Sequence, residues 1–170
     1  MRKRAPFDPY TLFEALERNR VSYVVVGGFA RIVHGSGEVT RGLDIVPSRR
    51  EENLRRLARA LDELHPTQRD QLITPEDIAG EDPVTLQTAA GTLTVVPKPW
   101  GTRGYDDIRI RASRENLGRG VRPQIASAVD LVRMLEASRR IEDAERLQRV
   151  RRMMELERRR THHRGLRIER

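Results

Sequence analysis

The sequence contains no cysteine, only two lysines (Lys3 and Lys98), and few aromatic residues. Without cysteine the chain can form neither a disulfide framework nor a thiolate zinc site, and it has no thiolate nucleophile. No hydrophobic run approaches the ~20 residues that a membrane-spanning helix requires. The basic residues at 1–4 are followed by Ala5-Pro6-Phe7-Asp8-Pro9, where a signal peptide would need an apolar stretch. We therefore expect a soluble, cytoplasmic protein with no membrane partner.

Positive charge is concentrated at the C-terminal end of the chain. The formal net charge of the 170 residues is +8. Positions 149–170 contain nine arginines and three glutamates, so the preceding residues are close to neutral. A basic segment of this kind can bind RNA or DNA by releasing the counterions of the phosphates. It can equally be a solvated helix that frays into a tail, and the absence of aromatic residues leaves it no platform for base stacking.

The spacing of hydrophobic and turn residues predicts an α/β (α+β) protein, in which helices flank a small mixed sheet. Asp8 followed by Pro9 is typical of a helix start, and 48–51 match a capping box. We expect residues 1–126 to form the main domain, 127–160 to form helices packed on it, and 161–170 to be a basic, disordered tail. The predicted strands are 21–26, 43–46, 84–88, 93–96 and an edge strand at 121–125, and the predicted helices include 9–18, 29–34 and one that begins near Ile141.

The most informative stretch is 23–46. A buried strand ends in Gly27-Gly28, a short helix follows, and a second strand carries Asp44. A strand–Gly-Gly–helix turn lets backbone amides face a phosphate. Two carboxylates in an Asp-x-Asp pattern on the neighbouring strand would lie on one face, because strand side chains alternate. Such carboxylates can hold the metal pair of phosphoryl or nucleotidyl transfer.

This stretch resembles the minimal nucleotidyltransferase family of the polymerase-β-like superfamily, which includes the nucleotidyltransferase toxins of type IV abortive-infection systems. The resemblance covers about residues 20–145. It is carried by Val24-Val25-Val26-Gly27-Gly28, His34-Gly35-Ser36, Thr40, Leu43-Asp44-Ile45-Val46, Gly91-Thr92-Leu93, Gly101-Thr102-Arg103-Gly104-Tyr105-Asp106-Asp107 and Ser127-Ala128-Val129-Asp130-Leu131. It implies a nucleotidyltransferase-like fold, Mg²⁺ as cofactor and a nucleoside triphosphate as ligand. Asp44 would be the catalytic residue and metal ligand, while Gly27, Gly28, Ser36 and Thr40 would bind the nucleotide.

The sequence departs from the family pattern at the carboxylates. The Asp-x-Asp motif reads Gly42-Leu43-Asp44, and Thr94 stands where the third carboxylate usually follows Gly-x-Leu. Glu38 stands where many relatives carry an arginine, and Leu135 replaces a lysine. Mg²⁺ needs near-octahedral oxygen ligands, so a site that lacks two of three carboxylates is poorly equipped to hold two ions.

Two functional hypotheses follow from this pattern. In the first, the protein is a catalytically impaired or inactive nucleotidyltransferase that acts by binding a nucleotide, a nucleic acid or a protein partner. In the alternative, it is an active Mg²⁺-dependent enzyme that moves a nucleoside monophosphate onto RNA, a protein or a small molecule. Glu38, Asp106 or Asp107 would then have to supply the missing carboxylates.

Several of these residues also have purely structural interpretations. Asp44 can serve as a hydrogen-bonding partner of the Gly-Gly turn, and His34 fits a structural role better than a catalytic one. Asp106 and Asp107 can cap the turn after Gly104. Trp100, the only tryptophan, can be a loop anchor or a lid over a nucleotide base.

Overall fold

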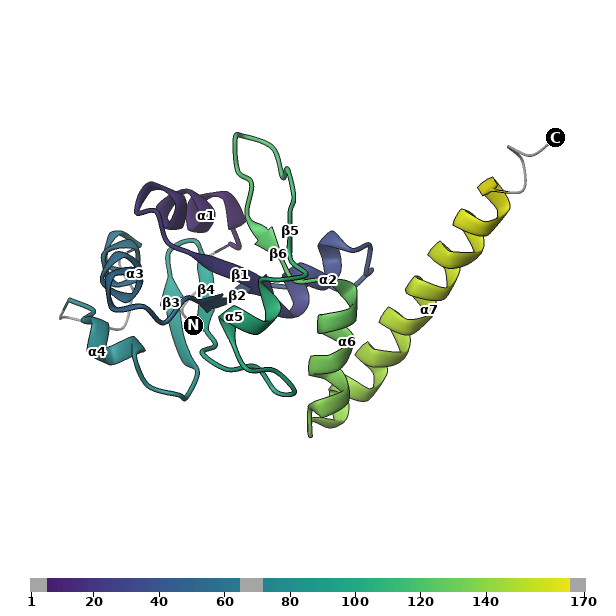
Figure 1. The fold of residues 1–170 in the computed structure, drawn as a ribbon. Helices are drawn as coiled ribbons and strands as arrows, with labels where there is room; N and C mark the ends of the chain where they lie inside the picture. The colour runs from purple at the N-terminus through teal and green to yellow at the C-terminus, as the bar shows by residue number, and fades with distance from the viewer. Residues whose placement is uncertain (1–5, 65–71, 166–170) are drawn as a thin grey trace.

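The computed structural model of the protein describes residues 6–64 and 72–165 (Figure 1). The helices are α1 (Pro9–Arg18), α2 (Gly27–Val33), α3 (Glu51–Glu63), α4 (Pro75–Ile78), α5 (Tyr105–Ile108), α6 (Ala128–Ala137) and α7 (Ile141–Gly165). The strands are β1 (Tyr23–Val26), β2 (Gly42–Pro47), β3 (Val84–Thr88), β4 (Gly91–Val95), β5 (Ser113–Arg114) and β6 (Gln124–Ile125). The fold is mixed α/β, as the sequence predicts.

The strands form one mixed sheet in the order β3-β4-β2-β1-β6-β5. β1 is antiparallel to β2 and parallel to β6, and β2 is parallel to β4. β3 and β4, which correspond to the strands predicted at 84–88 and 93–96, form an antiparallel hairpin in which Thr88 pairs with Gly91. All four residues of β1 are buried, because this central strand is covered on both faces.

The predicted start of α1 is confirmed, since the Asp8 side chain accepts a hydrogen bond from the Thr11 amide and Pro9 occupies the first turn. Three of the few aromatic residues, Phe13, Tyr23 and Phe29, pack together beneath this helix. Phe13 and Phe29 meet edge to face with ring centroids 5.4 Å apart, and Phe13 stacks on Tyr23 at 6.5 Å. These ring contacts join α1 to β1 and α2.

Two local predictions are wrong. The capping box at 48–51 does not form, because Ser48 continues the pairing of β2 and donates its amide to the Ser22 carbonyl. α3 therefore begins only after Arg50, which makes no side-chain cap. A capping box does form at α4, between Thr74 and Asp77. The strand predicted over 121–125 is reduced to β6, and it is not an edge strand because β5 lies outside it.

The C-terminal helices lie at the end of the sheet where β1 runs into α2 (Figure 1). Ser127 caps α6, since its hydroxyl accepts a hydrogen bond from the Asp130 amide. α7 packs along α6 through its first half, with Val150 buried, and its second half extends away from the domain (Figure 1). The helix continues to Gly165, and residues 166–170 of the predicted tail lie outside the described residues.

Within the described ranges, no helix combines the length and apolar character needed to cross a membrane.

Candidate functional site

Asp44 lies directly against the first glycine of the Gly-Gly turn. The antiparallel register pairs Asp44 of β2 with Val26, the last residue of β1. Gly27 follows with φ +69°, in the left-handed region that glycine adopts without strain. A β-carbon at Gly27 would lie 2.3 Å from Oδ2 of Asp44, so a side chain there would overlap the carboxylate. The glycine is therefore required both by its backbone angle and by the position of Asp44.

The neighbouring strand supplies hydroxyl groups where the resemblance implies acids. The parallel register of β2 and β4 pairs Asp44 with Thr94 and Gly42 with Thr92. The Thr94 hydroxyl lies 3.2 Å from that of Thr85 on β3. Asp44 is thus the single carboxylate among the three sheet positions where the family pattern has acids.

Burial raises the pKa of Asp44 above its ordinary value. The charges of Arg31 and Arg140 and the hydroxyl of Thr94 act in the opposite direction. The ionised form is therefore costly in this position, and the nearby guanidinium groups reduce that cost.

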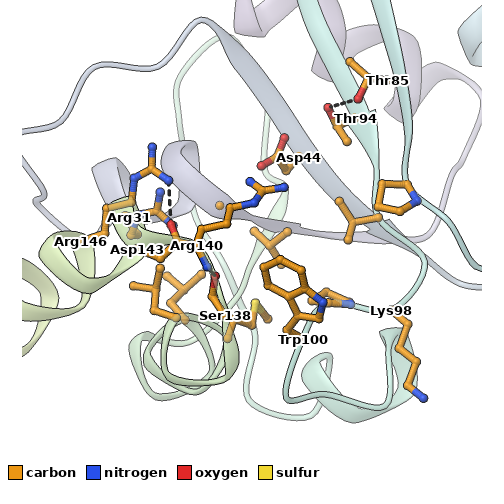
Figure 2. Close-up of a pocket in the computed structure, with 18 of the residues that line it drawn as sticks. Arg31, Asp44, Thr85, Thr94, Lys98, Trp100, Ser138, Arg140, Asp143 and Arg146 are labelled. Atoms are coloured by element: carbon orange, nitrogen blue, oxygen red, sulfur yellow. Dashed lines mark hydrogen bonds and ion pairs between the residues drawn. The ribbon is translucent and has the colours of Figure 1, made fainter.

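Asp44 opens onto a cavity of about 660 Å³ between the sheet and the C-terminal helices. One side of it is apolar, formed by Leu131, Met134 and Leu135 of α6. The rim carries Trp100, which is 50 % exposed. The Arg140 guanidinium lies 5.4 Å from the centre of the Trp100 ring, within the range of a cation–π contact. Figure 2 shows the Arg140 side chain extending across the cavity toward Asp44, with the Trp100 ring beneath it and Lys98 pointing away.

Two ion pairs lie at the wall of the cavity. Asp143 accepts hydrogen bonds from Ser138 and from Arg146, the latter at 2.7 Å. Burial would raise the pKa of Asp143, but these hydrogen bonds outweigh it and the pKa is lowered. Asp143 is therefore held as a carboxylate that positions Arg146 at the cavity wall.

The second pair joins Arg31 of α2 to Glu38 at 2.9 Å, and both side chains are nearly buried. Arg31 lines the cavity, whereas Glu38 lies behind it. Burial would raise the pKa of Glu38, but hydrogen bonds from Arg31 and Ser36 overcome it and the pKa is lowered. The loop after α2 is thus held by an ionised pair.

The structure brings only Gly27 and Asp44 of the predicted site residues to the cavity. Ser36 donates to Glu38, and the Thr40 hydroxyl donates to the carbonyl of Gly42. A β-carbon at Gly28 would contact Glu38 and Thr40 at 3.3–3.4 Å. Gly28, Ser36 and Thr40 therefore belong to the polar cluster around Glu38, next to the cavity but not among the residues that line it.

Asp106 and Asp107, two of the candidates to replace the missing carboxylates, have other partners. Asp107 accepts hydrogen bonds from the Arg103 amide and the Arg133 side chain, and Asp106 pairs with Arg109. Asp107 thus makes the turn contact that its position after Gly104 predicts. His34 hydrogen-bonds the Ala126 carbonyl at 2.8 Å, a contact that ties α2 to the segment before α6.

The groups around Asp44 do not fit a pair of Mg²⁺ ions. Among the side chains that the structure describes, in 6–64 and 72–161, no group of three or more His, Asp or Glu residues has the geometry to hold a metal ion. The charges that act on the Asp44 carboxyl are those of the Arg31, Arg140 and Arg146 guanidinium groups, which repel cations, and Thr94 offers only a neutral oxygen. The other acids that line the cavity, Glu81, Asp82 and Asp143, form no metal-binding group with Asp44.

Sequence reasoning missed the arginines of the cavity. Arg31 interrupts the otherwise apolar Phe29-Ala30-Arg31-Ile32-Val33, a signal that could have identified it. Arg140 and Arg146 carry no local signal, since they lie among many other arginines near the C-terminus. Comparison of the chain with protein-family models and with curated proteins gives no match in either case.

Proposed function

We propose that the chain binds a nucleoside triphosphate in the cavity above Asp44 and does not transfer it. The observation that carries the proposal is that Asp44, a half-buried carboxylate influenced by the charges of Arg31 and Arg140, stands alone at sheet positions where a transferase of the resembled family has three acids. Guanidinium groups bind phosphate oxygens through paired hydrogen bonds and supply positive charge without a metal. The protein is in this view a binding protein on a nucleotidyltransferase-like fold.

The cavity has complementary walls for such a ligand. Its volume of about 660 Å³ falls within the range of small-molecule sites, roughly 300–1,000 Å³. Trp100 can stack on the base, and the apolar α6 wall can cover the opposite face of the base. Arg140, between Asp44 and Trp100, is then the residue nearest to the phosphates.

Binding can be followed through the intrinsic fluorescence of Trp100, because it is the only tryptophan in the chain. We expect ATP or GTP to quench this fluorescence and calorimetry to return the same dissociation constant. Arg140→Ala should weaken binding at least ~10-fold, the loss typical of a charged hydrogen bond. Arg139→Ala is the matched control, since Arg139 is exposed and does not line the cavity, and it should bind as the wild type does.

A transfer assay separates this proposal from an active enzyme. Labelled nucleotide, Mg²⁺ or Mn²⁺, and total RNA or protein acceptors should give no labelled product. Metal-dependent labelling that Asp44→Ala abolishes would establish the active transferase instead. An absence of nucleotide binding at millimolar concentration would contradict both the binding protein and the active transferase.

The second half of α7 favours a further role, contact with RNA or DNA. Every described side chain from 155 to 161 is exposed, and this part of the helix extends away from the domain (Figure 1). Arg158 and Arg160 present their charges to solvent there. An exposed helical segment with three consecutive arginines, in which Leu156 is the one apolar side chain between 155 and 161, is suited to phosphate contacts rather than to core packing.

This role is tested by a mobility-shift assay across a salt series. Replacing Arg158, Arg159 and Arg160 by alanine should weaken binding and reduce the salt slope by about 2–3, one unit for each lost phosphate contact. The same triple replacement of Arg55, Arg56 and Arg59 on α3 is the control. Equal effects of the two triple variants would mean that only the overall charge matters.

A further inference from the structure

A second cavity lies at the opposite end of β1 from Asp44. It has a volume of about 500 Å³ and is bordered by the C-terminal end of α1, the start of β1 and the β5–β6 pair. None of its lining residues lines the cavity above Asp44. We call it the β6 pocket, after Gln124 of β6 on its wall.

Positive charge dominates the β6 pocket. Arg20, Arg114 and Arg122 line it, and Glu17 is its only acidic residue. The Glu17 carboxylate is already engaged, since it accepts a hydrogen bond from the Arg122 amide at 3.1 Å. Three guanidinium groups against one carboxylate leave the pocket suited to a doubly charged oxyanion.

Two side chains that line the β6 pocket each carry a buried polar atom without a hydrogen-bonding partner. These atoms are Oη of Tyr23 and Oε1 of Gln124, and only one further buried side-chain atom in the described residues is in this state. Tyr23 is 6 % exposed. Buried polar groups are almost always paired, so unpaired atoms in two side chains that line one cavity point to a ligand that reaches them when it fills the cavity. A hydroxyl-bearing molecule, or a water that it carries, would satisfy both.

The backbone at Arg20 supports the same conclusion. The end of α1 closes with a Schellman motif, in which the Val21 amide bonds to the Leu16 carbonyl and the Arg20 amide to the Glu17 carbonyl. Arg20 has φ +55°, the left-handed position that favours glycine. Arg20 thus lines the pocket from a backbone position that is strained for any residue other than glycine. The strain lowers stability, and a role of the Arg20 side chain in binding would explain why an arginine stands there.

We propose that the β6 pocket binds a small hydroxylated phosphomonoester, of the size of a sugar phosphate. The arginines bind the phosphate, and the Tyr23 hydroxyl and the Gln124 amide bind the hydroxyl groups. A phosphomonoester carries nearly two negative charges at neutral pH, which matches the excess of guanidinium groups. This site is independent of nucleotide binding above Asp44.

The test uses ribose 5-phosphate, inorganic phosphate and ribose as probes, with binding measured by calorimetry on the full chain. Ribose 5-phosphate should bind most tightly, phosphate more weakly, and ribose not at all at millimolar concentration. Arg114→Ala should weaken binding of ribose 5-phosphate at least ~10-fold. Arg103→Ala, an exposed arginine outside the pocket, should leave it unchanged.

Two variants give a result that a purely structural role would not produce. Arg20→Gly relieves the left-handed strain, and Tyr23→Phe removes an unpaired buried hydroxyl, so each should raise the melting temperature of the ligand-free protein. Both should nevertheless weaken binding of ribose 5-phosphate several-fold. Arg140→Ala should not affect it, which separates this site from the nucleotide cavity. The proposal is overturned if neither phosphate probe binds at millimolar concentration, or if binding survives Arg114→Ala and Arg20→Gly unchanged.

Discussion

The contact between Gly27 and Asp44 leads to a quantitative prediction for Gly27→Ala. Alanine at φ +69° costs about 1 kcal/mol in the left-handed region. Its β-carbon would also lie 2.3 Å from the Asp44 carboxylate, and forcing such a group into a packed site costs about 1–3 kcal/mol. We therefore expect Gly27→Ala to lower the free energy of unfolding by about 2–4 kcal/mol.

A double-mutant cycle separates the two contributions. Asp44→Ala removes the carboxylate oxygens and leaves only the Asp44 β-carbon, 3.3 Å from the new methyl group. In that background Gly27→Ala should cost only about 1 kcal/mol, so the coupling energy is about 1–3 kcal/mol. Gly37→Ala is the control, because a β-carbon there meets nothing within 4 Å, and it should be close to neutral.

Urea unfolding at neutral pH measures these differences. With an m-value of about 2 kcal/mol per molar urea, Gly27→Ala should shift the midpoint by about 1–2 M. The double variant should recover most of the shift relative to Asp44→Ala. If Gly27→Ala costs the same with and without Asp44, the carboxylate does not occupy the space above the glycine and the description of the site fails.

Three further predictions concern the site and its support. Because burial raises the pKa of Asp44 above its ordinary 3.8, its stabilising contribution is complete below that pH and is lost as the pH rises through the folded-state pKa. Urea titrations should therefore show the wild type losing stability relative to Asp44→Asn as the pH increases, and a constant difference would contradict the shift. Glu38→Ala leaves Arg31 buried without its carboxylate and should cost about 3–5 kcal/mol by thermal unfolding, with Glu76→Ala, exposed on α4, as control. Ser127→Ala removes the cap of α6 and should cost about 1 kcal/mol by urea unfolding, whereas no loss would show that the cap is redundant.

Elements with strong local signals could be predicted closely. Asp8-Pro9 marks the start of α1 because a capping side chain and a proline both act within one turn. The β3–β4 hairpin follows from the small residues between two apolar runs. The capping box at 48–51 shows the limit of such signals. The Ser48 amide bonds instead to the carbonyl of Ser22, the residue just before β1, and this contact depends on the neighbouring chain segment and not on the local sequence.

The candidate site divides in the same way. Gly27 and Asp44 could be predicted to meet, because a short connection between neighbouring strands brings their ends together. The charged groups around Asp44 could not be predicted from the sequence. Arg31 and Arg140 are separated by more than a hundred positions, and they meet only because α6 and α7 fold back beside α2.

The amino-acid sequence by itself determined where most of the helices and strands form, and that one carboxylate stands where the resembled family has several. These properties depend on residue type and on spacing over a few positions, so they are readable along the chain. Only the tertiary structure decided that guanidinium groups face this carboxylate and that a second, cationic pocket forms at the far end of β1. Charge and burial at a site are sums over neighbours in space, and those neighbours come from distant parts of the chain.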